Sequence, residues 1–305
     1  MKQKNLVPHI LLIYMFWGFN WVVMRVASDY YDPFFFVACR LSIGAAALLI
    51  VCAVRGTLIP PRKYWGWILF SGLLMMSMNN LMVQISIHYI GAGLAAVLNY
   101  TQSVFVCILA VIILHERFTI RKALGIVFCV AGLLILMNIE TTAHIWAVFV
   151  ALGSAFMWAC SSIIVKAKFT GCDMLQYTAW QLTFGSIVLI LYLILFSPEA
   201  LHDGIQMAFH GNAPWVFRIG TLLYNGLLAS ATAFVLWNYI LTNMEAGKAS
   251  IAVMAVPAVG VILGVLILHE PMTIFIAIGI LLIFAGIFVV LSHGQKTQTK
   301  STGSR

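Results

Sequence analysis

The stretch from Ala92 to Met137, AGLAAVLNYTQSVFVCILAVIILHERFTIRKALGIVFCVAGLLILM, decides the fold because the chain contains it twice. Shifted by 154 residues, it aligns without a gap on 246–291, and seventeen of the forty-six aligned pairs are identical. Among them is Leu114-His115-Glu116, which returns as Leu268-His269-Glu270. A period this long in an apolar chain indicates two copies of one membrane unit.

The composition excludes a water-soluble domain. Of the 305 residues, 63% are hydrophobic and 9% are charged. Apolar runs of roughly twenty residues, long enough to cross a bilayer, recur along the whole chain. The net charge of +8 comes from basic residues in short loops between these runs, where they set membrane orientation and predict no nucleic-acid partner. The six cysteines have neither CxxC nor metal-ligand spacing, so we expect no metal and no cofactor.

The apolar runs predict an all-α polytopic membrane protein with ten transmembrane helices. We place them at 8–27, 33–54, 65–87, 93–114, 121–137, 145–165, 174–196, 216–243, 247–268 and 273–291. The second helix has a clear start, because Asp32-Pro33 combines a capping acid with a first-turn proline.

The first two helices repeat as well, at an offset of 141 that pairs Trp17 with Trp158 and Gly44 with Gly185. The larger offset of the later helices requires thirteen extra residues, which we expect in a polar loop between Phe196 and Trp215.

Five helices per copy is an odd number, so the two copies must cross the membrane in opposite directions. The sequence therefore predicts two inverted repeats, 1–139 and 140–292, around a central cavity, followed by a cytoplasmic tail at 293–305.

The loop charges fix the expected orientation. With the N-terminus in the cytoplasm, fourteen of the seventeen basic residues fall on the inner side. Arg25, Arg40 and Arg218 are the three that fall toward the outer side. Basic residues accumulate in cytoplasmic loops, so we expect both ends of the chain in the cytoplasm.

These residues carry a resemblance to a known family. The chain resembles the EamA type of the drug/metabolite transporter superfamily through Phe16-Trp17-Gly18-Phe19-Asn20, Asp32-Pro33, Ala38-Cys39-Arg40-Leu41 and the paired Leu-His-Glu runs. The resemblance covers residues 8 to 292. It implies ten helices in two inverted halves around a central cavity, and export of amino acids or other small metabolites.

Two departures from the family pattern stand out. The family often has a proline midway along the helix at 93–114, where this chain has Gln102-Ser103, although the mate Pro257 is present. This leaves the bend of that helix open. The glycine that usually precedes the glutamate is His115 here, and His269 in the second copy.

Polar and aromatic residues midway along the helices are the candidates for a substrate site. Trp17, Asn20 and Trp21 share one helical face, and Asn99 and Gln102 share another. The full candidate set is Trp17, Asn20, Trp21, Arg40, Asn80, Gln84, Asn99, Gln102, Trp158, Ser161, Trp180 and Asn238. Indoles, amides and hydroxyls suit a neutral or zwitterionic solute with an apolar part.

Each candidate also has a structural interpretation, because polar side chains in membrane helices often only join helices by hydrogen bonds. Arg40 could bind a substrate carboxylate, or it could snorkel to the surface or pair structurally. We expect Glu116 and Glu270 to stabilise the starts of the helices that follow them. We interpret His88, His115 and His269 as interface residues at helix ends.

The sequence predicts a secondary transporter that exports a small metabolite, most simply an amino acid or similar zwitterion, through the bacterial cytoplasmic (inner) membrane. A flippase for a lipid-linked sugar and a broad drug-efflux carrier are the alternatives. A membrane enzyme is disfavoured, because no HExxH, GxSxG or P-loop motif occurs. Small residues such as Gly125 and Gly132 permit close helix packing, either within one molecule or in a homodimer.

All nine acidic residues lie at helix ends or in loops of this arrangement. The first helix offers Asn20 at mid-depth and its mate is Ser161, and neither side chain titrates. We therefore expect movement down the solute's own gradient, or exchange for another solute, in place of cation-for-proton exchange.

The loop between Phe196 and Trp215 tests the predicted topology. A cysteine introduced as Asp203→Cys should react with a membrane-impermeant thiol reagent in intact cells, because the orientation places this segment outside. The parent chain, with its six native cysteines, is the control. Labelling that appears only after lysis would contradict the arrangement.

Overall fold

The computed structural model describes residues 5–27, 29–136, 144–268 and 273–291, and every regular element in these ranges is helical. The elements are α1 (Val7–Ala27), α2 (Pro33–Val54), η1 (Arg62–Tyr64), α3 (Trp65–Gly72), η2 (Leu73–Asn79), α4 (Asn80–Tyr100), α5 (Gln102–Leu114), α6 (Ile120–Leu136), α7 (Ile145–Lys168), α8 (Met174–Phe196), α9 (Pro198–His210), α10 (Trp215–Leu223), η3 (Tyr224–Thr232), α11 (Ala233–Asn243), α12 (Ala246–Ala252), η4 (Val253–Ala255), α13 (Val256–Leu268) and α14 (Ile274–Leu291).

Six helices of the described chain are long and apolar enough to cross a membrane. They are Val7–Met24, Pro33–Val54, Arg62–Ser86, Ile145–Lys168, Met174–Phe196 and Trp215–Asn243, and three shorter apolar helices accompany them. Large apolar side chains such as Ile50, Phe149 and Leu195 are exposed on their outer faces. Exposed apolar surface along spanning helices is the surface that lipid covers, so the chain is a polytopic membrane protein.

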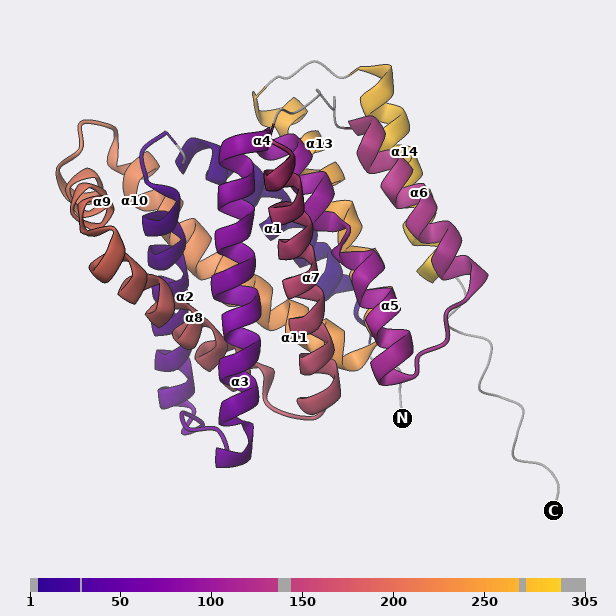
Figure 1. Cartoon of the computed structure of the whole chain (residues 1–305), viewed down its shortest axis with the longest axis horizontal. Helices are drawn as coiled ribbons and strands as arrows, with labels where there is room; N and C mark the ends of the chain where they lie inside the picture. Colours follow the sequence, from indigo (N-terminus) through magenta and orange to yellow (C-terminus); the bar gives the residue numbers. More distant parts are fainter. Residues whose placement is uncertain (1–4, 28, 137–143, 269–272, 292–305) are drawn as a thin grey trace.

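The predicted break between helices at 65–87 and 93–114 falls inside α4. A straight helix of twenty residues spans about 30 Å, yet the Asn79 and Asn99 side chains both hydrogen-bond Ser154 of α7. Between them, the Ser86 hydroxyl donates to the Ala147 carbonyl. The chain therefore runs along α7 and turns back within α4, and Figure 1 shows the ribbon turning over beside that label.

The helix at 93–114 is interrupted even without the family's proline. A single turn residue, Thr101, separates α4 from α5, and the Thr101 hydroxyl donates to the Leu98 carbonyl. The equivalent position of the second copy lies in the short 3-10 segment η4, just before Pro257. There the Tyr14 hydroxyl donates to the Ala252 carbonyl at 2.7 Å. At both helix breaks, a side-chain hydroxyl thus donates to a backbone carbonyl near the break. A bilayer requires such a partner because it offers no water to hydrogen-bond the carbonyl.

Each copy also contains a π-helical segment at the same place. These segments are η2 and η3, which lie in the third predicted helix and in its mate. A π-helical turn adds a residue and leaves carbonyls without their usual partners, and such segments are frequent at functional sites. The end of η2 presents Asn79 and the start of α4 presents Asn80, both of which face inward.

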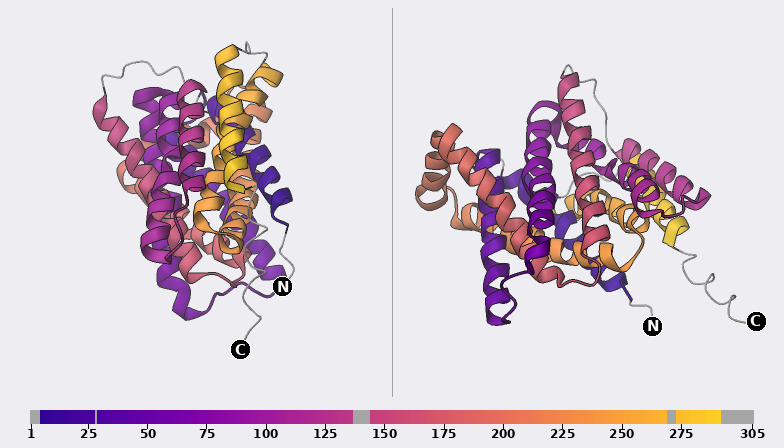
Figure 2. Two further views of the ribbon diagram at one scale, coloured as in Figure 1. Left: turned by 90° about the vertical axis from the view of Figure 1, so that its right-hand side faces the viewer. Right: turned by 60° about the horizontal axis from the view of Figure 1, so that its bottom comes forward.

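Matched glycines let the two copies cross closely. A Cβ atom on Gly44 of α2 would lie 2.8 Å from the Gly226 carbonyl oxygen of η3, and one on Gly185 of α8 would lie 2.2 Å from Cβ of Met76. Gly132 of α6 packs equally tightly on α14, 2.6 Å from the Gly279 oxygen. Figures 1 and 2 show the α6–α14 pair on one lateral side of the bundle and α9 on the opposite side.

The expected polar loop between Phe196 and Trp215 is wrong in detail, because most of it forms helix α9. Pro198 stands at its first turn. Gly204 lies so close to the Phe35 ring that a Cβ atom would be 2.3 Å away. At the other end, the Arg218 guanidinium donates to the Met207 and Ala208 carbonyls at 3.1 and 2.6 Å. These contacts with distant residues stabilise a helix whose own sequence is too polar to indicate one.

Gly185→Ala tests the close crossing of α8 and η2. The added methyl group would overlap Met76, so we expect a lower melting temperature, equivalent to a loss of about 1–3 kcal/mol in the free energy of unfolding. The matched control is Gly66→Ala, where a Cβ atom meets nothing within 4 Å. Equal melting temperatures for both variants in detergent would contradict the crossing.

Candidate functional site

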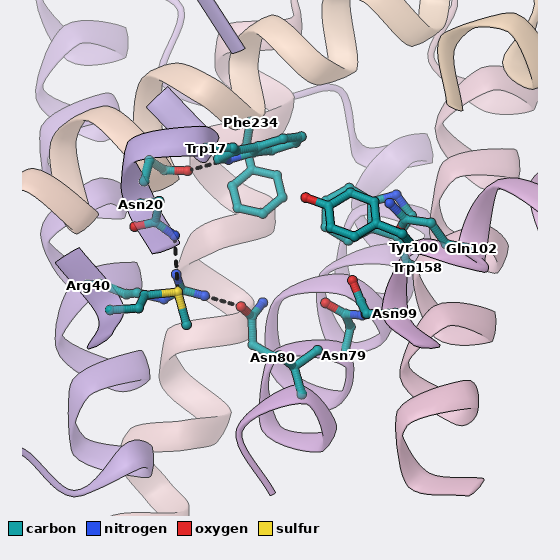
Figure 3. Close-up of a pocket in the computed structure, with 13 residues that line it drawn as sticks. Trp17, Asn20, Arg40, Asn79, Asn80, Asn99, Tyr100, Gln102, Trp158 and Phe234 are labelled. Atoms are coloured by element: carbon teal, nitrogen blue, oxygen red, sulfur yellow. Dashed lines mark hydrogen bonds between the residues drawn. The ribbon is translucent and has the colours of Figure 1, made fainter. Parts of the chain in front are cut away.

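A cavity of about 90 Å³ lies between the helices, and this volume has room for several water molecules. Figure 3 shows polar and aromatic side chains from both copies around it. Its lining residues are Trp17, Asn20, Met24, Arg40, Asn79, Asn80, Val83, Asn99, Tyr100, Gln102, Trp158, Ala229 and Phe234.

Arg40 is the cation of this cavity. It is 6% exposed, so its side chain does not snorkel to a surface. Its guanidinium donates to the amide oxygens of Asn80 and, at 3.3 Å, of Asn225. Among the described residues no carboxylate lies within 4.0 Å of it. The partners of this buried cation are therefore neutral amides, and no described residue balances its charge.

Aromatic rings form one wall. Trp17 lies 5.6 Å from Trp158 and 5.5 Å from Phe234, measured between ring centroids, and both pairs meet edge to face. The Trp17 indole nitrogen donates to the Ala229 carbonyl of η3 at 2.9 Å, which is a carbonyl of the π-helical segment. Trp237 packs behind these rings and is fully buried. The paired tryptophans are therefore deep cavity residues and not an interfacial belt.

Two asparagines form the opposite wall. Asn79 donates to the Ser154 carbonyl at 2.8 Å, and Asn99 donates to the Ser154 hydroxyl at 2.9 Å. Because their amide nitrogens are engaged with α7, the oxygens of both side chains point toward the cavity (Figure 3). This wall therefore accepts hydrogen bonds.

Four buried polar atoms of the lining have no hydrogen-bond partner within the described chain. They are Asn20 Oδ1, Gln102 Oε1, Arg40 Nε and Trp158 Nε1. Leaving such an atom unpaired costs about 1–3 kcal/mol, so native structures keep few buried polar atoms without a partner. Two are acceptors and two are donors, which matches a solute that carries both kinds of group.

The structure brings seven of the twelve predicted site residues to the cavity: Trp17, Asn20, Arg40, Asn80, Asn99, Gln102 and Trp158. Ser161 and Asn238 are buried in a separate polar cluster with Gln181. Trp180 packs on Trp65 at a tilted angle and its indole N–H donates to the Leu58 carbonyl, away from the cavity. Gln84 does not line the cavity, and the side chain of Trp21 lies outside the described part of the structure.

The sequence analysis missed six lining residues, namely Met24, Asn79, Val83, Tyr100, Ala229 and Phe234. Asn79 carried a signal, because two consecutive asparagines in an apolar helix cannot both face lipid. The other five look like ordinary helix residues, and only the tertiary arrangement of the helices brings them to the cavity.

Charged residues gather at one end of the bundle. Lys122 of α6 contacts Glu116 at 3.2 Å and Glu245 at 2.9 Å, and Lys248 contacts Glu245 at 3.1 Å. The Lys166 ammonium donates to the Met244 carbonyl at 2.8 Å. We call this end, defined by Glu116, Lys122, Lys166, Glu245 and Lys248, the charged face.

Glu116 stabilises a helix start, but not the expected one. Its carboxylate accepts from the backbone N–H groups of Ala246 at 2.7 Å and Gly247 at 3.3 Å, at the start of α12 in the second copy. The following helix, α6, is capped by Thr119. The expectation for Glu270 and His269 lies outside the described residues, as does the His88 side chain. Tertiary contact between the copies decided which helix Glu116 caps.

The charged face lowers the pKa of Glu245 below its usual value. Burial alone would raise this pKa, but hydrogen bonds and charge attraction from Lys122 and Lys248 outweigh burial. Because the pKa of Glu245 is lower in the folded protein than in the unfolded protein, the ionised Glu245 carboxylate stabilises the fold at pH values above the ordinary glutamate pKa. This stabilisation is lost as the pH falls through the lowered pKa of Glu245. Glu245 is half exposed, so solvent screens much of the effect.

The spanning helices define an integral membrane protein, and a polar cavity between such helices is typical of a transporter. Residues 7–138 and 145–292 both match the EamA-like transporter family, and the chain belongs to this family. The first match ends and the second begins at the boundary between the two copies.

Named relatives agree with this class. The chain is 30% identical over 288 residues to YoaV of Bacillus subtilis, an uncharacterized transporter, with 92% of this chain and 94% of the relative covered. It is 24% identical to a probable terminal-alkyne amino-acid exporter of Streptantibioticus cattleyicolor, with 100% of both chains covered. It is 23% identical to a probable amino-acid metabolite efflux pump of Escherichia coli, with 92% of each chain covered.

One solved crystal structure shares the fold with a TM-score of 0.79, and the match covers 95% of this chain and 99% of the other. At 16% identity this likeness shows the fold alone. The family and the relatives describe a transporter and not an enzyme.

The twin tryptophans test the cavity. Trp17→Ala and Trp158→Ala should each reduce efflux of a transported solute from preloaded cells to the level of cells without the protein, because they remove the aromatic wall. Trp180→Ala is the matched control, since this indole packs on Trp65 outside the cavity. Normal efflux by both cavity variants, at equal membrane abundance, would contradict this assignment.

Proposed function

We propose that the protein is a secondary transporter that exports an amino acid or similar zwitterionic solute by alternating access of two inverted five-helix halves. The observation that carries this proposal is the set of unpartnered donors and acceptors that surround Arg40 in one buried cavity. A zwitterion is a small solute that can satisfy a cation, one neutral donor and two acceptors together.

The carboxylate of the solute binds Arg40. The guanidinium has a free Nε–H, and it forms shorter and stronger hydrogen bonds with a carboxylate than with the amides it now contacts. Trp158 Nε1 supplies a second unpaired donor on the aromatic wall. The low dielectric of a buried site strengthens the attraction between the two charges.

The ammonium group and the side chain of the solute bind elsewhere in the cavity. Asn20 Oδ1 and Gln102 Oε1 are unpaired acceptors for ammonium N–H groups. The rings of Trp17, Trp158 and Phe234 offer faces for a cation or an apolar side chain. The relatives named as amino-acid exporters support this solute class.

The described helices group naturally into ten membrane crossings. With α3, η2 and the first part of α4 taken as one crossing, and with α10, η3 and α11 as its mate, each copy has five. The equivalent glycine crossings and helix breaks of the two copies support an inverted repeat. The basic residues of the charged face support a cytoplasmic location for that face and for both chain ends, in the cytoplasmic membrane of a bacterium.

Polar residues lie between this cavity and the charged face. Along α7, Trp158 of the cavity wall is followed by Ser161, whose hydroxyl donates to the Ser71 carbonyl, and then by Lys166 of the charged face. In this arrangement the charged face is closed. Alternating access requires these residues to move apart while the cavity closes on its other side.

The lining residues include no Asp or Glu, so the described cavity holds no carboxylate that could exchange a proton for the solute. Transport therefore follows the solute's own gradient, or exchanges one solute for another. In proteoliposomes without a pH gradient or voltage, an outward gradient of unlabelled amino acid should draw labelled amino acid inward by counterflow.

Arg40→Gln tests the carboxylate site. Loss of a charged hydrogen-bonding partner removes about 1.5–3 kcal/mol of binding, so the half-saturation concentration for counterflow should rise about 10- to 100-fold. Arg40→Lys should restore part of the affinity, because it keeps the charge and loses the planar fork. Arg55→Gln, at the exposed end of α2, is the control.

An unchanged half-saturation concentration in Arg40→Gln would contradict carboxylate binding at this position. Uptake that appears only when a proton gradient is imposed would contradict uncoupled transport. Unchanged amino-acid efflux together with altered envelope lipids on overproduction would favour a lipid flippase.

A further inference from the structure

A second buried polar cluster lies between the aromatic rings and the charged face. The Gln181 amide donates to Ser161 Oγ at 3.4 Å and to the Ser71 carbonyl at 3.5 Å. Asn238 donates to Gln181 Oε1 at 3.2 Å and to Thr178 Oγ1 at 2.9 Å. Ser161, Gln181 and Asn238 have no exposed surface, and Asn238 Oδ1 has no partner within the described chain. We call Ser161, Gln181 and Asn238 the inner cluster.

Two of the three inner-cluster residues occupy the same sequence positions as cavity residues of the other copy. At the offset of 141, Gln181 is the mate of Arg40 and Ser161 is the mate of Asn20. At the offset of 154, Ser71 is the mate of Asn225. The contact from Arg40 to Asn225, at 3.3 Å, therefore has an equivalent in the contact from Gln181 to Ser71.

The helices that carry these contacts cross in equivalent ways. Gly44 and Gly226 meet where α2 crosses η3. Their mates are Gly185 and Gly72, and a Cβ atom on Gly72 would lie 2.8 Å from the Gln181 carbonyl oxygen of α8. Backbone crossings this tight cannot slide without clashes, so both pairs move as units.

One substitution between the copies explains why only one of the two places is hollow. Val83 lines the cavity, and its mate in the second copy is Trp237. Trp237 directly precedes Asn238 of the inner cluster in α11, and its fully buried indole lies 5.9 Å from Trp158 and 6.2 Å from Trp17 between ring centroids. Its Nε1 atom has no hydrogen-bond partner within the described chain. The Trp237 indole is much larger than the Val83 side chain at the mate position, where the cavity lies open.

We infer that the inner cluster is a second, uncharged binding site for the transported carboxylate solute, which Trp237 fills in this state and vacates when the charged face opens. The inference rests on the proposed function. The amide N–H of Gln181, the hydroxyl of Ser161 and the indole N–H of Trp237 donate to the carboxylate in place of the Arg40 guanidinium. Asn238 Oδ1 accepts from the ammonium group.

Gln181 is uncharged, whereas its mate Arg40 is a cation, so the inner cluster should bind the carboxylate more weakly than the cavity does. Hydrogen bonds from neutral donors to a carboxylate are weaker than those from a guanidinium, so the half-saturation concentration on the charged face should be about tenfold higher. An uncoupled carrier cannot change the ratio of solute concentrations that the two compartments reach at equilibrium. Its two faces can, however, have different half-saturation concentrations. The protein therefore responds to solute accumulated on the side of the charged face, as an overflow carrier does.

Sided transport measurements test this inference. Half-saturation concentrations for a labelled amino acid are measured from each face, in inside-out and right-side-out vesicles. Gln181→Leu should raise the value at least fivefold on the charged face and leave the other face unchanged. Arg40→Gln should do the reverse. Equal effects of Gln181→Leu on both faces, or none, would overturn the inner site.

The same data separate this inference from the proposed function. If Arg40→Gln changes neither face while the parent transports, carboxylate binding at Arg40 fails and the proposed function fails with it. If Arg40→Gln acts on its own face and Gln181→Leu on neither, only the inner site fails.

A second variant covers the case in which Gln181→Leu does not fold. Ser161→Cys in a Cys160→Ala background reports access to the inner cluster by an impermeant thiol reagent added at the charged face. Trp237→Val, which installs the residue of the mate position, should increase the labelling rate at least fivefold, whereas Trp237→Phe should increase it less. A labelling rate that Trp237→Val leaves unchanged would overturn the role of Trp237.

Discussion

A buried guanidinium in a membrane protein constrains everything around it. Arg40 sits within α2, deep among apolar helices, where an isolated charge costs several kcal/mol. Two asparagine oxygens from two other segments satisfy part of its donor capacity. One of these segments is η3 of the second copy, so the position of Arg40 joins the copies. The helices converge on Arg40, and the space left between them is the cavity.

The second constraint is the backbone. A bilayer offers no water to a carbonyl released by a broken helix, so each break needs a side-chain donor. Tyr14 serves the break near Ala252, and Trp17 serves the π-helical carbonyl of Ala229. Both donors come from α1 and both recipients from the second copy. The breaks therefore bind the copies together and shape the cavity wall at the same time.

The two copies diverge at the positions where function requires a difference. Crossings built on glycine are kept, as at Gly44 and Gly185, because any Cβ atom would collide with a neighbouring helix. Polar positions on these same helices differ, with Arg40 in one copy and Gln181 in the other. Close packing tolerates no change in shape, whereas polar chemistry in a solvated or ligand-filled space tolerates substitution. A shared scaffold can thus present a charged site on one side and a neutral cluster on the other.

The sequence by itself determined the membrane class, the duplicated unit and most helix positions, because apolar runs and an internal period are local, linear signals. It also identified Trp17, Arg40 and Asn99 as cavity candidates, since polar and aromatic residues at mid-depth are rare. The tertiary structure alone decided that Trp180 lies outside the cavity and that Phe234 lines it. It likewise decided that Glu116 caps α12 of the other copy and that the residues before Trp215 form α9. In each of these cases the deciding partner is far away in the chain, and a contact between distant residues depends on how helices cross, which no local pattern of residues specifies.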